Sequence, residues 1–306
     1  MIRQSFAGAV ALALALTSGA LVRATEIIFD VTIGRQHQTS TGRALPESFV
    51  FELGVFEPGF NPTTGNMADW AGRWKPAARA AYFTQGRYYS GVASFTANVA
   101  PFTPGAAAYV WGMSGTEWIL FRKSAWVWPL GSSVGAPAMT WTADASVTVV
   151  CGSVVPSGAS FYYRSAAAAG ALPPPLPWSE WCKLHFTTAQ LSNAAISGPN
   201  VDADNDGQSN IMEYAAATWP EQMTSRRQPE ITPSIAANPV AAQLSFKTDL
   251  RARLIVTGEV SSNLFAWDST PSATVVTSVP GEYSVRDASP SGTFFRRYLR
   301  LRVAPQ

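Results

Sequence analysis

Apolar and polar residues alternate along several short stretches in the first half of the chain, with the spacing of half-buried β-strands. Phe49, Phe51, Leu53 and Val55 lie two residues apart and therefore share one face. Clusters of Gly, Pro, Asn and Ser separate the stretches, as turns separate antiparallel strands. This pattern predicts an antiparallel β-sandwich-like unit over residues 25–165 and not a βαβ fold. Its strands are expected at residues 26–33, 49–55, 88–99, 107–113, 118–121 and 146–155.

One short helix is expected among these strands, at residues 66–75. Asn66 is a suitable N-cap, Asp69 lies in the first turn, and Pro76 stops the helix. Trp70 and Trp74 are four residues apart and therefore face the same side. Packing of the helix against a sheet explains this tryptophan pair.

The composition changes beyond the first unit. Residues 166–183 are rich in Ala and Pro, which predicts a stiff and extended connector. Residues 184–220 predict a short helix, a polar loop and a second helix over 210–217. Residues 221–240 contain several prolines and predict a second linker.

The last part of the chain, residues 241–306, predicts a small β-sandwich-like unit. In its final strand Leu299, Leu301 and Val303 share one face, while Arg300 and Arg302 share the other. The arginine row is either a solvated face that discourages edge pairing or a site for an acidic glycan. Strands are expected at residues 244–246, 253–260, 273–279, 282–286 and 294–303.

The N-terminus has the features of a secretory signal peptide. Arg3 supplies a positive charge, residues 6–16 are apolar, and cleavage is expected after Ala24. This predicts export to the periplasm, the cell surface or the extracellular space. No second apolar run of membrane length follows, so we expect no membrane span in the mature chain.

The charge balance argues against nucleic acid as a partner. The chain has 22 basic and 20 acidic residues, and two of the basic ones, Arg3 and Arg23, lie in the expected signal peptide. The mature chain is therefore close to neutral, and nothing in its net charge favours nucleic acid or an anionic membrane surface. Apolar residues make up 47% of the chain, enough for a sizeable core.

Cys151 and Cys182 are the two cysteines of the chain. In an exported protein a pair of cysteines predicts one disulfide, which here would tether the connector to the first unit. Two buried free thiols are the alternative, because sequence does not show whether the geometry allows a bridge.

The most specific pattern in the chain is D-x-D-x-D-G-x5-E, at residues 202–213. It places oxygen-bearing side chains and one backbone carbonyl at the spacing of a loop that binds a hard cation of the size of Ca²⁺. Gly207 permits the sharp turn at place six. A solvated acidic turn at the start of a helix is the alternative, although the crowded carboxylates would repel each other without a cation. The expected ligands are Asp202, Asp204, Asp206, the carbonyl of Gln208, Asn210 and Glu213.

Residues 202–215 resemble the calcium loops of the EF-hand and dockerin type. They are more closely similar to a D-x-D-x-D-G-x-S-N-x-x-E-Y-A segment that recurs in secreted multi-module bacterial proteins. Ser209 departs from the EF-hand pattern, which has an aliphatic residue there to pair two loops, so the resemblance implies one solitary site. Residues 260–267 and 296–303 likewise resemble the small C-terminal β-modules of such proteins, a largely uncharacterised family, and imply architecture and export rather than activity.

Nine of the eleven tryptophans lie between Trp70 and Trp181. Trp126 and Trp128 share one face of an extended segment, and an exposed pair of this kind can stack on sugar rings. Burial in the core of the sandwich is the alternative, since each ring covers a large apolar area.

No catalytic motif is convincing. The sequence Gly131-Ser-Ser-Val-Gly135 matches G-x-S-x-G, but Pro137 prevents the helix that a nucleophile elbow requires. His37 and His185 lie outside any metal-binding spacing. The carboxylates that a glycosidase would need are scattered over the first unit, and no spacing singles out two of them. These residues are Glu52, Glu57, Asp69, Glu117 and Asp144.

The sequence therefore predicts a non-catalytic, exported, calcium-binding protein that is structural, adhesive or glycan-binding. Its expected partner is a polysaccharide or a component of the cell surface or matrix, and calcium would rigidify the junction between two β-rich units. A polysaccharide-active enzyme with two carboxylates in an aromatic cleft of the first unit is the alternative.

Overall fold

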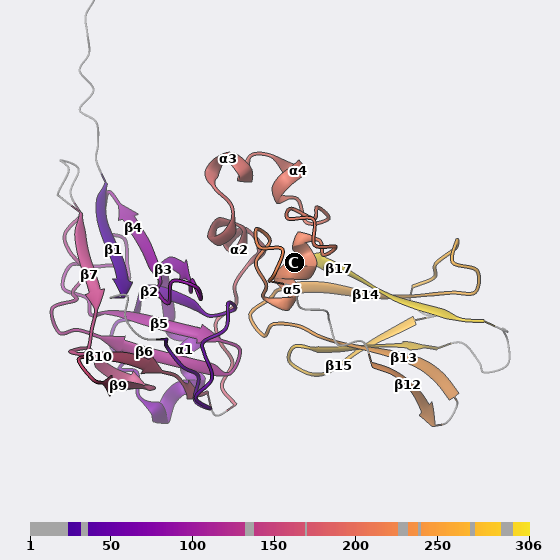
Figure 1. The fold of residues 1–306 in the computed structure, drawn as a ribbon, viewed down its shortest axis with the longest axis horizontal. Helices are drawn as coiled ribbons and strands as arrows, with labels where there is room; N and C mark the ends of the chain where they lie inside the picture. Colours follow the sequence, from indigo (N-terminus) through magenta and orange to yellow (C-terminus); the bar gives the residue numbers. More distant parts are fainter. Residues whose placement is uncertain are drawn as a thin grey trace, which may run out of the picture.

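The computed structural model describes residues 24–31, 36–131, 138–168, 170–225, 232–237, 240–269, 273–288 and 296–306. The expected signal peptide up to residue 23 and the serines of the G-x-S-x-G motif lie outside these residues. The chain is mainly β, with several antiparallel sheets and few helices, which confirms the predicted fold class (Figure 1). A helical segment lies between an N-terminal and a C-terminal β-rich unit.

The N-terminal unit contains two sheets and a hairpin. The first sheet has the order β4-β1-β7, in which β1 pairs with β4 antiparallel and with β7 parallel. The second has six strands in the order β11-β6-β5-β2-β3, with β8 also paired to β6. The strands are β1 (Thr25–Val31), β2 (Val50–Phe56), β3 (Trp74–Ala81), β4 (Ser90–Phe95), β5 (Ala108–Ser114), β6 (Glu117–Arg122), β7 (Met139–Ala143), β8 (Thr148–Cys151), the hairpin of β9 (Ser153–Ser157) and β10 (Ser160–Arg164), and β11 (Ala166–Ala167).

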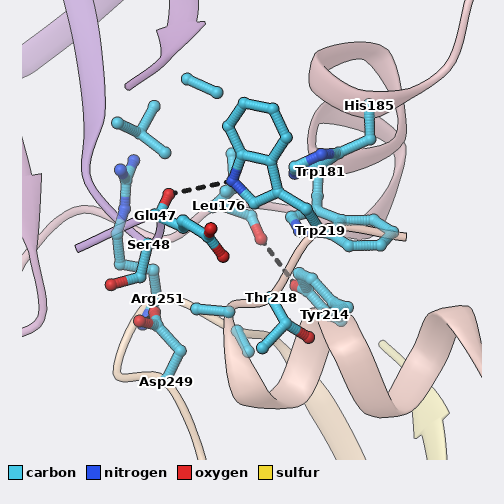
Figure 2. Close-up of a pocket in the computed structure, with 14 residues that line it drawn as sticks. Glu47, Ser48, Leu176, Trp181, His185, Tyr214, Thr218, Trp219, Asp249 and Arg251 are labelled. Atoms are coloured by element: carbon cyan, nitrogen blue, oxygen red, sulfur yellow. Dashed lines mark hydrogen bonds between the residues drawn. The ribbon is translucent and has the colours of Figure 1, made fainter. Parts of the chain in front are cut away.

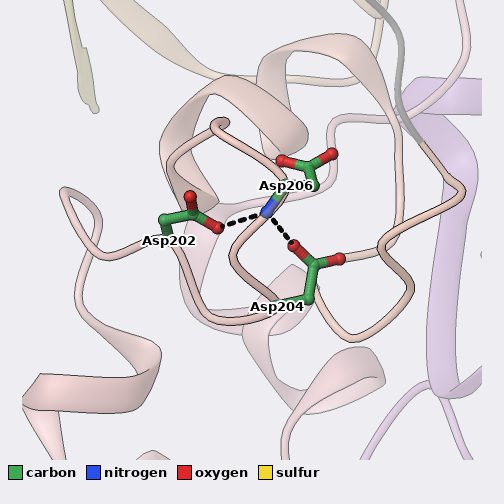
Figure 3. Close-up of side chains that lie close together, drawn as sticks. All are labelled: Asp202, Asp204 and Asp206. Carbon is green, nitrogen blue, oxygen red and sulfur yellow. Dashed lines mark hydrogen bonds between the residues drawn. The ribbon is translucent and has the colours of Figure 1, made fainter.

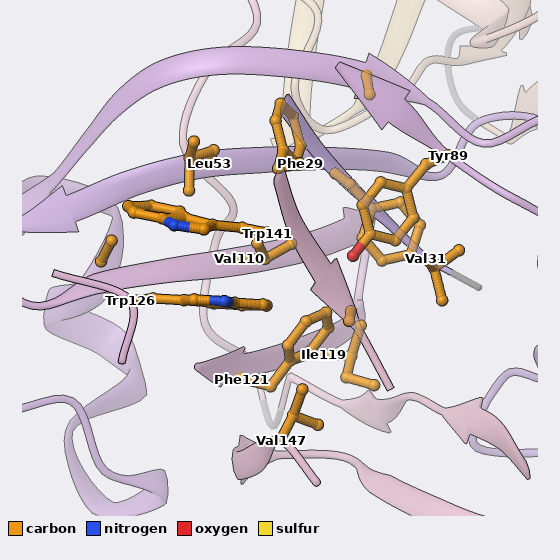
Figure 4. Packing of buried hydrophobic residues seen from close by; sticks show 14 of the residues in the cluster. Phe29, Val31, Leu53, Tyr89, Val110, Ile119, Phe121, Trp126, Trp141 and Val147 are labelled. Atoms are coloured by element: carbon orange, nitrogen blue, oxygen red, sulfur yellow. The ribbon is translucent and has the colours of Figure 1, made fainter. Parts of the chain in front are cut away.

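Strand β2 is buried on both faces, because the six-stranded sheet is covered on both sides. The face with Phe51, Leu53 and Val55 joins the main core, where residues of both sheets pack together (Figure 4). On the opposite face Phe56 joins a second, tryptophan-rich cluster. The alternation in this stretch therefore marks two buried faces and not one buried and one solvated face.

The predicted helix is shorter than expected. α1 (Met67–Arg73) passes directly into β3 at Trp74, so Pro76 lies inside a strand. The sheet accommodates the proline because β3 is an edge strand and the pairing shifts register beside Gly54. Trp70 and Trp74 nevertheless lie in the same tryptophan-rich cluster, as their spacing predicted.

The middle segment contains four short helices: α2 (Trp178–His185), α3 (Thr188–Leu191), α4 (Ala194–Ser197) and α5 (Asn210–Ala216). Two side chains of α2, the residue that follows α2, two side chains of α5 and one from the proline-rich stretch before α2 pack in one small core. Its buried members are Leu176, Trp181, Cys182, Phe186, Ile211 and Tyr214. The expected connector over 166–183 thus contributes a strand, β11, and most of a helix, α2.

The C-terminal unit has a four-stranded sheet, β12-β13-β16-β15, and a two-stranded ribbon of β14 and β17. Gly258 on β14 lies so close to Val285 on β16 that a β-carbon there would clash, which brings the two layers together. The linker expected over 221–240 contains a strand, β12, so this unit begins earlier than the sequence predicted. The strands are β12 (Thr232–Ala237), β13 (Val240–Lys247), β14 (Leu254–Ser261), β15 (Ala273–Val279), β16 (Glu282–Asp287) and β17 (Tyr298–Pro305).

Among the described residues, none of the helices has the length and apolar character that crossing a membrane requires.

Candidate metal centre at the junction of two β-rich units

Three aspartates come together in the loop between α4 and α5. Oxygen atoms of Asp202, Asp204 and Asp206 lie within 4.8 Å of one another (Figure 3). The backbone N–H of Asp206 donates to Asp202 Oδ1 at 3.1 Å and to Asp204 Oδ1 at 3.2 Å. The chain therefore wraps around these carboxylates and keeps them on the inner side of the loop.

Two residues with positive φ produce this turn. Asn205 has a φ of 62° and Gly207 a φ of 94°. Gly207 lies at place six, where the sequence predicted a conformation that a β-carbon disfavours. Its N–H donates to Asp202 Oδ2 at 2.8 Å, and the N–H of Gln208 donates to Asp206 Oδ1 at 2.7 Å.

Helix α5 supplies Asn210 and Glu213, both with 0% exposure. The side-chain amide of Asn210 donates to the carbonyls of Ile196 at 2.8 Å and Gly198 at 2.9 Å, which orients this residue. Among the described residues, Asn210 Oδ1 and both carboxylate oxygens of Glu213 have no hydrogen-bond partner. Buried polar atoms are nearly always paired, so these oxygens require an explanation.

The electrostatics of Glu213 depend on the same loop. Burial, together with the negative charges of Asp204, Asp206 and Asp202, raises the pKa of Glu213 to about 8. Burial and the neighbouring aspartates also raise the pKa of Asp204. The charges that raise these two pKa values are all negative, and the side chains of the cluster offer oxygen atoms as ligands. That set fits a hard cation such as Ca²⁺ and not a metal that prefers nitrogen or sulfur.

Six ligands were predicted from the sequence, and the structure brings their residues into one loop and the first turn of α5. The cluster consists of Asp202, Asp204 and Asp206, and the negative charges of all three raise the pKa of Glu213. Gln208 is buried at 7% exposure, beside Asp206. The short helix predicted before the loop is divided into two single turns, α3 and α4, because Asn193 interrupts it and caps α4.

The helix that carries Glu213 also holds the neighbouring segments in place. Tyr214, the next residue, donates its hydroxyl hydrogen to the carbonyl of Leu176 at 2.6 Å and accepts from the N–H of Arg253 at 2.7 Å. The carbonyl of Ala215 accepts from the N–H of Asp249 at 2.7 Å. α5 therefore joins the connector to the start of the C-terminal unit.

A buried ionic cluster links that region to the N-terminal sheet. Glu52 on β2, with 0% exposure, accepts from Trp74 Nε1 at 2.7 Å and from Arg79 Nε at 2.9 Å. The Arg251 guanidinium, from the loop before β14, also donates to Glu52. Burial alone would raise the pKa of Glu52, but the charges of Arg251 and Arg79 outweigh it and hold the pKa below its ordinary value. No local pattern in the sequence relates Glu52 to Arg251, which lie 199 positions apart, so this cluster was not predicted.

A cavity of about 30 Å³ lies beside this cluster, between α2, α5 and the N-terminal unit (Figure 2). It has room for two or three water molecules, at about 10–15 Å³ each. Trp219, which follows α5, reaches the N-terminal unit and donates from Nε1 to the carbonyl of Glu47 at 3.2 Å. The junction is therefore packed, and His185 contributes to its lining and not to a metal-binding cluster.

The structure corrects the glycan-stacking prediction for Trp126 and Trp128. Their exposures are 3% and 2%, and both rings lie in the main core. Trp126 stacks on Trp141 at a centroid distance of 6.0 Å, with the rings nearly parallel (Figure 4). The backbone folds this segment against the sandwich, so the rings fill the core and no flat aromatic surface forms there.

The structure also corrects the predicted disulfide. Cys151 and Cys182 are both free and buried. Cys151 belongs to the tryptophan-rich cluster of the N-terminal unit, and Cys182 belongs to the small core around α2 and α5. Burial raises the pKa of each thiol to about 11, so neither is a reactive thiolate at neutral pH.

Each buried or partly buried carboxylate weighed for an enzyme has another partner. Glu57 pairs with Arg73 and Lys75. Glu117 accepts from the hydroxyls of Ser40 and Ser165, and Asp144 pairs with Lys123. Glu52 is enclosed by its two arginines, and Asp69 is exposed on α1. The enzyme alternative stays a prediction.

Comparison with known proteins gives no identification, since no family model, no curated protein and no solved structure matches the chain.

Proposed function

We propose that the loop over residues 202–213 binds one Ca²⁺ and that the ion stabilises the junction of two β-rich units in an exported, non-catalytic structural protein. The observation that carries the proposal is Glu213, a fully buried carboxylate beside three aspartates, whose two oxygens have no hydrogen-bond partner within the described part of the chain. A divalent cation supplies the missing charge and the missing coordination at once. The D-x-D-x-D-G-x5-E pattern and its resemblance to solitary calcium loops support the same assignment.

The proposed ligands lie partly in the loop and partly on α5. The aspartates at 202, 204 and 206 each offer a carboxylate oxygen, and the carbonyl of Gln208 offers a fourth ligand. Asn210 and Glu213 add their free oxygens from the first turn of α5. Because two ligands belong to α5, the bound ion fixes this helix against the loop.

Fixing α5 orders the junction through its other contacts. Tyr214 and Ala215 hydrogen-bond the connector at Leu176 and the 249–253 segment that enters β14. The same segment carries Arg251, which reaches Glu52 in the N-terminal sheet. Calcium thus stabilises the relative placement of the two β-rich units, which suits a structural or adhesive protein at a surface or in a matrix.

Calorimetric titration of the mature chain tests the site. We expect one Ca²⁺ per chain with a Kd of about 10⁻⁴ to 10⁻³ M, the range of extracellular modules, or somewhat tighter with four carboxylates. Mg²⁺ should bind more weakly, since it demands a smaller octahedral shell. Glu213→Gln and Asp204→Asn should abolish saturable binding, whereas the control Asp69→Asn, at an exposed acid on α1, should leave it unchanged.

Limited proteolysis tests the structural role separately. Calcium should slow cleavage between residues 166 and 225 in the native chain and not in the Glu213→Gln variant. Absence of saturable binding by the native chain would reduce the loop to an acidic turn. Binding without protection would keep the metal site and remove its role at the junction.

A further inference from the structure

The charges of the chain are separated along its length. Residues 241–306 contain eight basic and five acidic residues, although the mature chain as a whole is nearly neutral. Four of the eight basic residues lie between Arg296 and Arg302, at the start of β17. Arg251 is buried against Glu52 of the N-terminal sheet, so seven basic and five acidic residues remain, and the C-terminal unit is modestly basic.

An apolar tip lies in the same unit. The loop that follows β14 can be traced in Figure 1. In this loop Phe265 is 94% exposed and Leu264 is 53% exposed. Two backbone hydrogen bonds between Val260 and Asp268, each of 2.9 Å, close the base of the loop. Phe265 therefore makes little contribution to the core, and together with Leu264 it gives the loop an exposed apolar apex.

The loop holds this tip outward through its own hydrogen bonds. Ser261 Oγ accepts from the N–H of Leu264 at 2.9 Å, and Asn263 Oδ1 accepts from the N–H of Phe265 at 2.9 Å. Trp267 Nε1 donates to the carbonyl of Leu264 at 3.1 Å. Leu264 has a φ of 66°, a conformation unfavourable for a residue with a β-carbon. Local strain that presents an apolar side chain to solvent points to a binding role.

The base of the loop rests on the outer face of the β14–β17 ribbon. The Arg300 guanidinium lies 4.0 Å from the centroid of the Trp267 ring and pairs with Glu259 on the neighbouring strand. Arg302 lies two residues further along the same exposed face. The opposite face of β17 packs Leu299 and Leu301 on the core of this unit. Arg300 and Trp267 thus lie at the base of the apolar tip, and Arg302 lies on the same face two residues farther from the loop.

We propose that this end of the C-terminal unit docks on an anionic phospholipid bilayer, with Leu264 and Phe265 inserted among the lipids. The tip is convex and apolar, which matches a deformable lipid surface rather than the rigid groove of a protein partner. Arg300 and Arg302 lie where they meet negatively charged headgroups, and Trp267 lies at the level that amphipathic aromatic rings prefer. The proposal does not depend on calcium, because none of these residues belongs to the calcium loop.

Vesicle co-sedimentation with the mature chain in EDTA tests the proposal. The vesicles are phosphatidylcholine alone or phosphatidylcholine with about one third phosphatidylglycerol, and the salt is raised from about 0.1 M to about 1 M. We expect binding to the anionic vesicles that falls with salt, together with a blue shift of tryptophan fluorescence. Phe265→Ser should weaken binding about ten- to a hundredfold, the range for losing one buried aromatic side chain. Arg302→Gln should weaken it about fivefold.

Matched controls separate docking from unfolding and from calcium. Val99→Ser removes another exposed apolar side chain, in the N-terminal unit, and should bind like the native chain. Asp204→Asn should also bind like the native chain, so failure of the calcium site leaves this test intact. Equal binding by Phe265→Ser and Val99→Ser would overturn the proposal. Self-association in solution that Phe265→Ser abolishes would also overturn it. Retention on an acidic polysaccharide that Phe265→Ser abolishes, without any binding to vesicles, would overturn it as well.

Discussion

Replacing Glu52 by Gln tests whether the buried ionic cluster holds the two β-rich units together. The substitution keeps the size of the side chain and an oxygen for Trp74 Nε1, but it removes the negative charge. Arg251, at 2% exposure, then keeps its positive charge in a site without a compensating anion. Arg79 is affected less, because it also pairs with Glu180 at 2.8 Å.

The magnitude follows from burial. Removing one partner of a buried ion pair typically costs about 3–5 kcal/mol, because the remaining charge stays desolvated. With a urea slope of about 2–3 kcal/mol per M, the midpoint of unfolding should fall by about 1–2 M. Since Arg251 belongs to the segment that enters the C-terminal unit, we also expect the single transition to separate into two as the units lose their link.

Urea unfolding monitored by tryptophan fluorescence measures this loss. The control Glu57→Gln removes a carboxylate from the same sheet whose partners, Arg73 and Lys75, are exposed, and it should cost far less. A double variant, Glu52→Gln with Arg251→Met, should recover much of the stability, because it removes the stranded charge. Equal losses in the two single variants would refute the reasoning.

Three further predictions concern the rest of the core. Both thiols should resist a thiol reagent in the native protein and react in urea, and a reductant should leave the urea midpoint unchanged; failure to react in urea would indicate a bridge. Burial lowers the pKa of His37 from 6.5 to about 4. The contribution of neutral His37 to the free energy of unfolding is therefore fully present above pH 6.5, and about 3 kcal/mol of it should be lost as the pH falls towards 4. His37→Asn should flatten this dependence in urea midpoints measured across that range, and an unchanged slope would contradict the assignment. Gly54→Ala places a β-carbon 2.4 Å from the carbonyl oxygen of Lys75 and should cost about 1–3 kcal/mol in thermal unfolding, whereas Gly72→Ala, with open space on α1, should be neutral or stabilising.

Local patterns predicted those parts of the fold that depend on near neighbours in the sequence. Alternation located β2, β5, β6 and most strands of the C-terminal unit, and the loop pattern located the aspartate cluster together with its turn at Gly207. Strand β3 was missed, because its alanines carry little signal and Pro76 argues against a strand. Helix α2 was missed inside a proline-rich stretch, although Trp178, Trp181 and Cys182 have helical spacing.

The incorrect predictions rest on rules that ignore tertiary contacts. Two cysteines in an exported chain favour a disulfide, but here each thiol packs in a separate core. Two tryptophans on one face suit either a stacking platform or a buried core, and here the chain folds that face into the sandwich, which is the second of these alternatives. The ionic cluster had no local signal, since Glu52 and Arg251 meet only when both units are placed.

The calcium loop and the ionic cluster are connected through one short stretch of chain, and this makes their energies interdependent. Asp249 and Arg253 bond to α5, and Arg251 between them bonds to Glu52. If calcium stabilises α5 and thereby this stretch, an intact cluster stabilises the calcium-binding form by the same free energy. Glu52→Gln should therefore weaken calcium affinity by about five- to a hundredfold, the usual range of such coupling, although Glu52 is not a predicted ligand. Calorimetric titration of this variant beside Glu57→Gln measures the coupling, and equal affinities in the two would show that the loop binds calcium without influence on the junction.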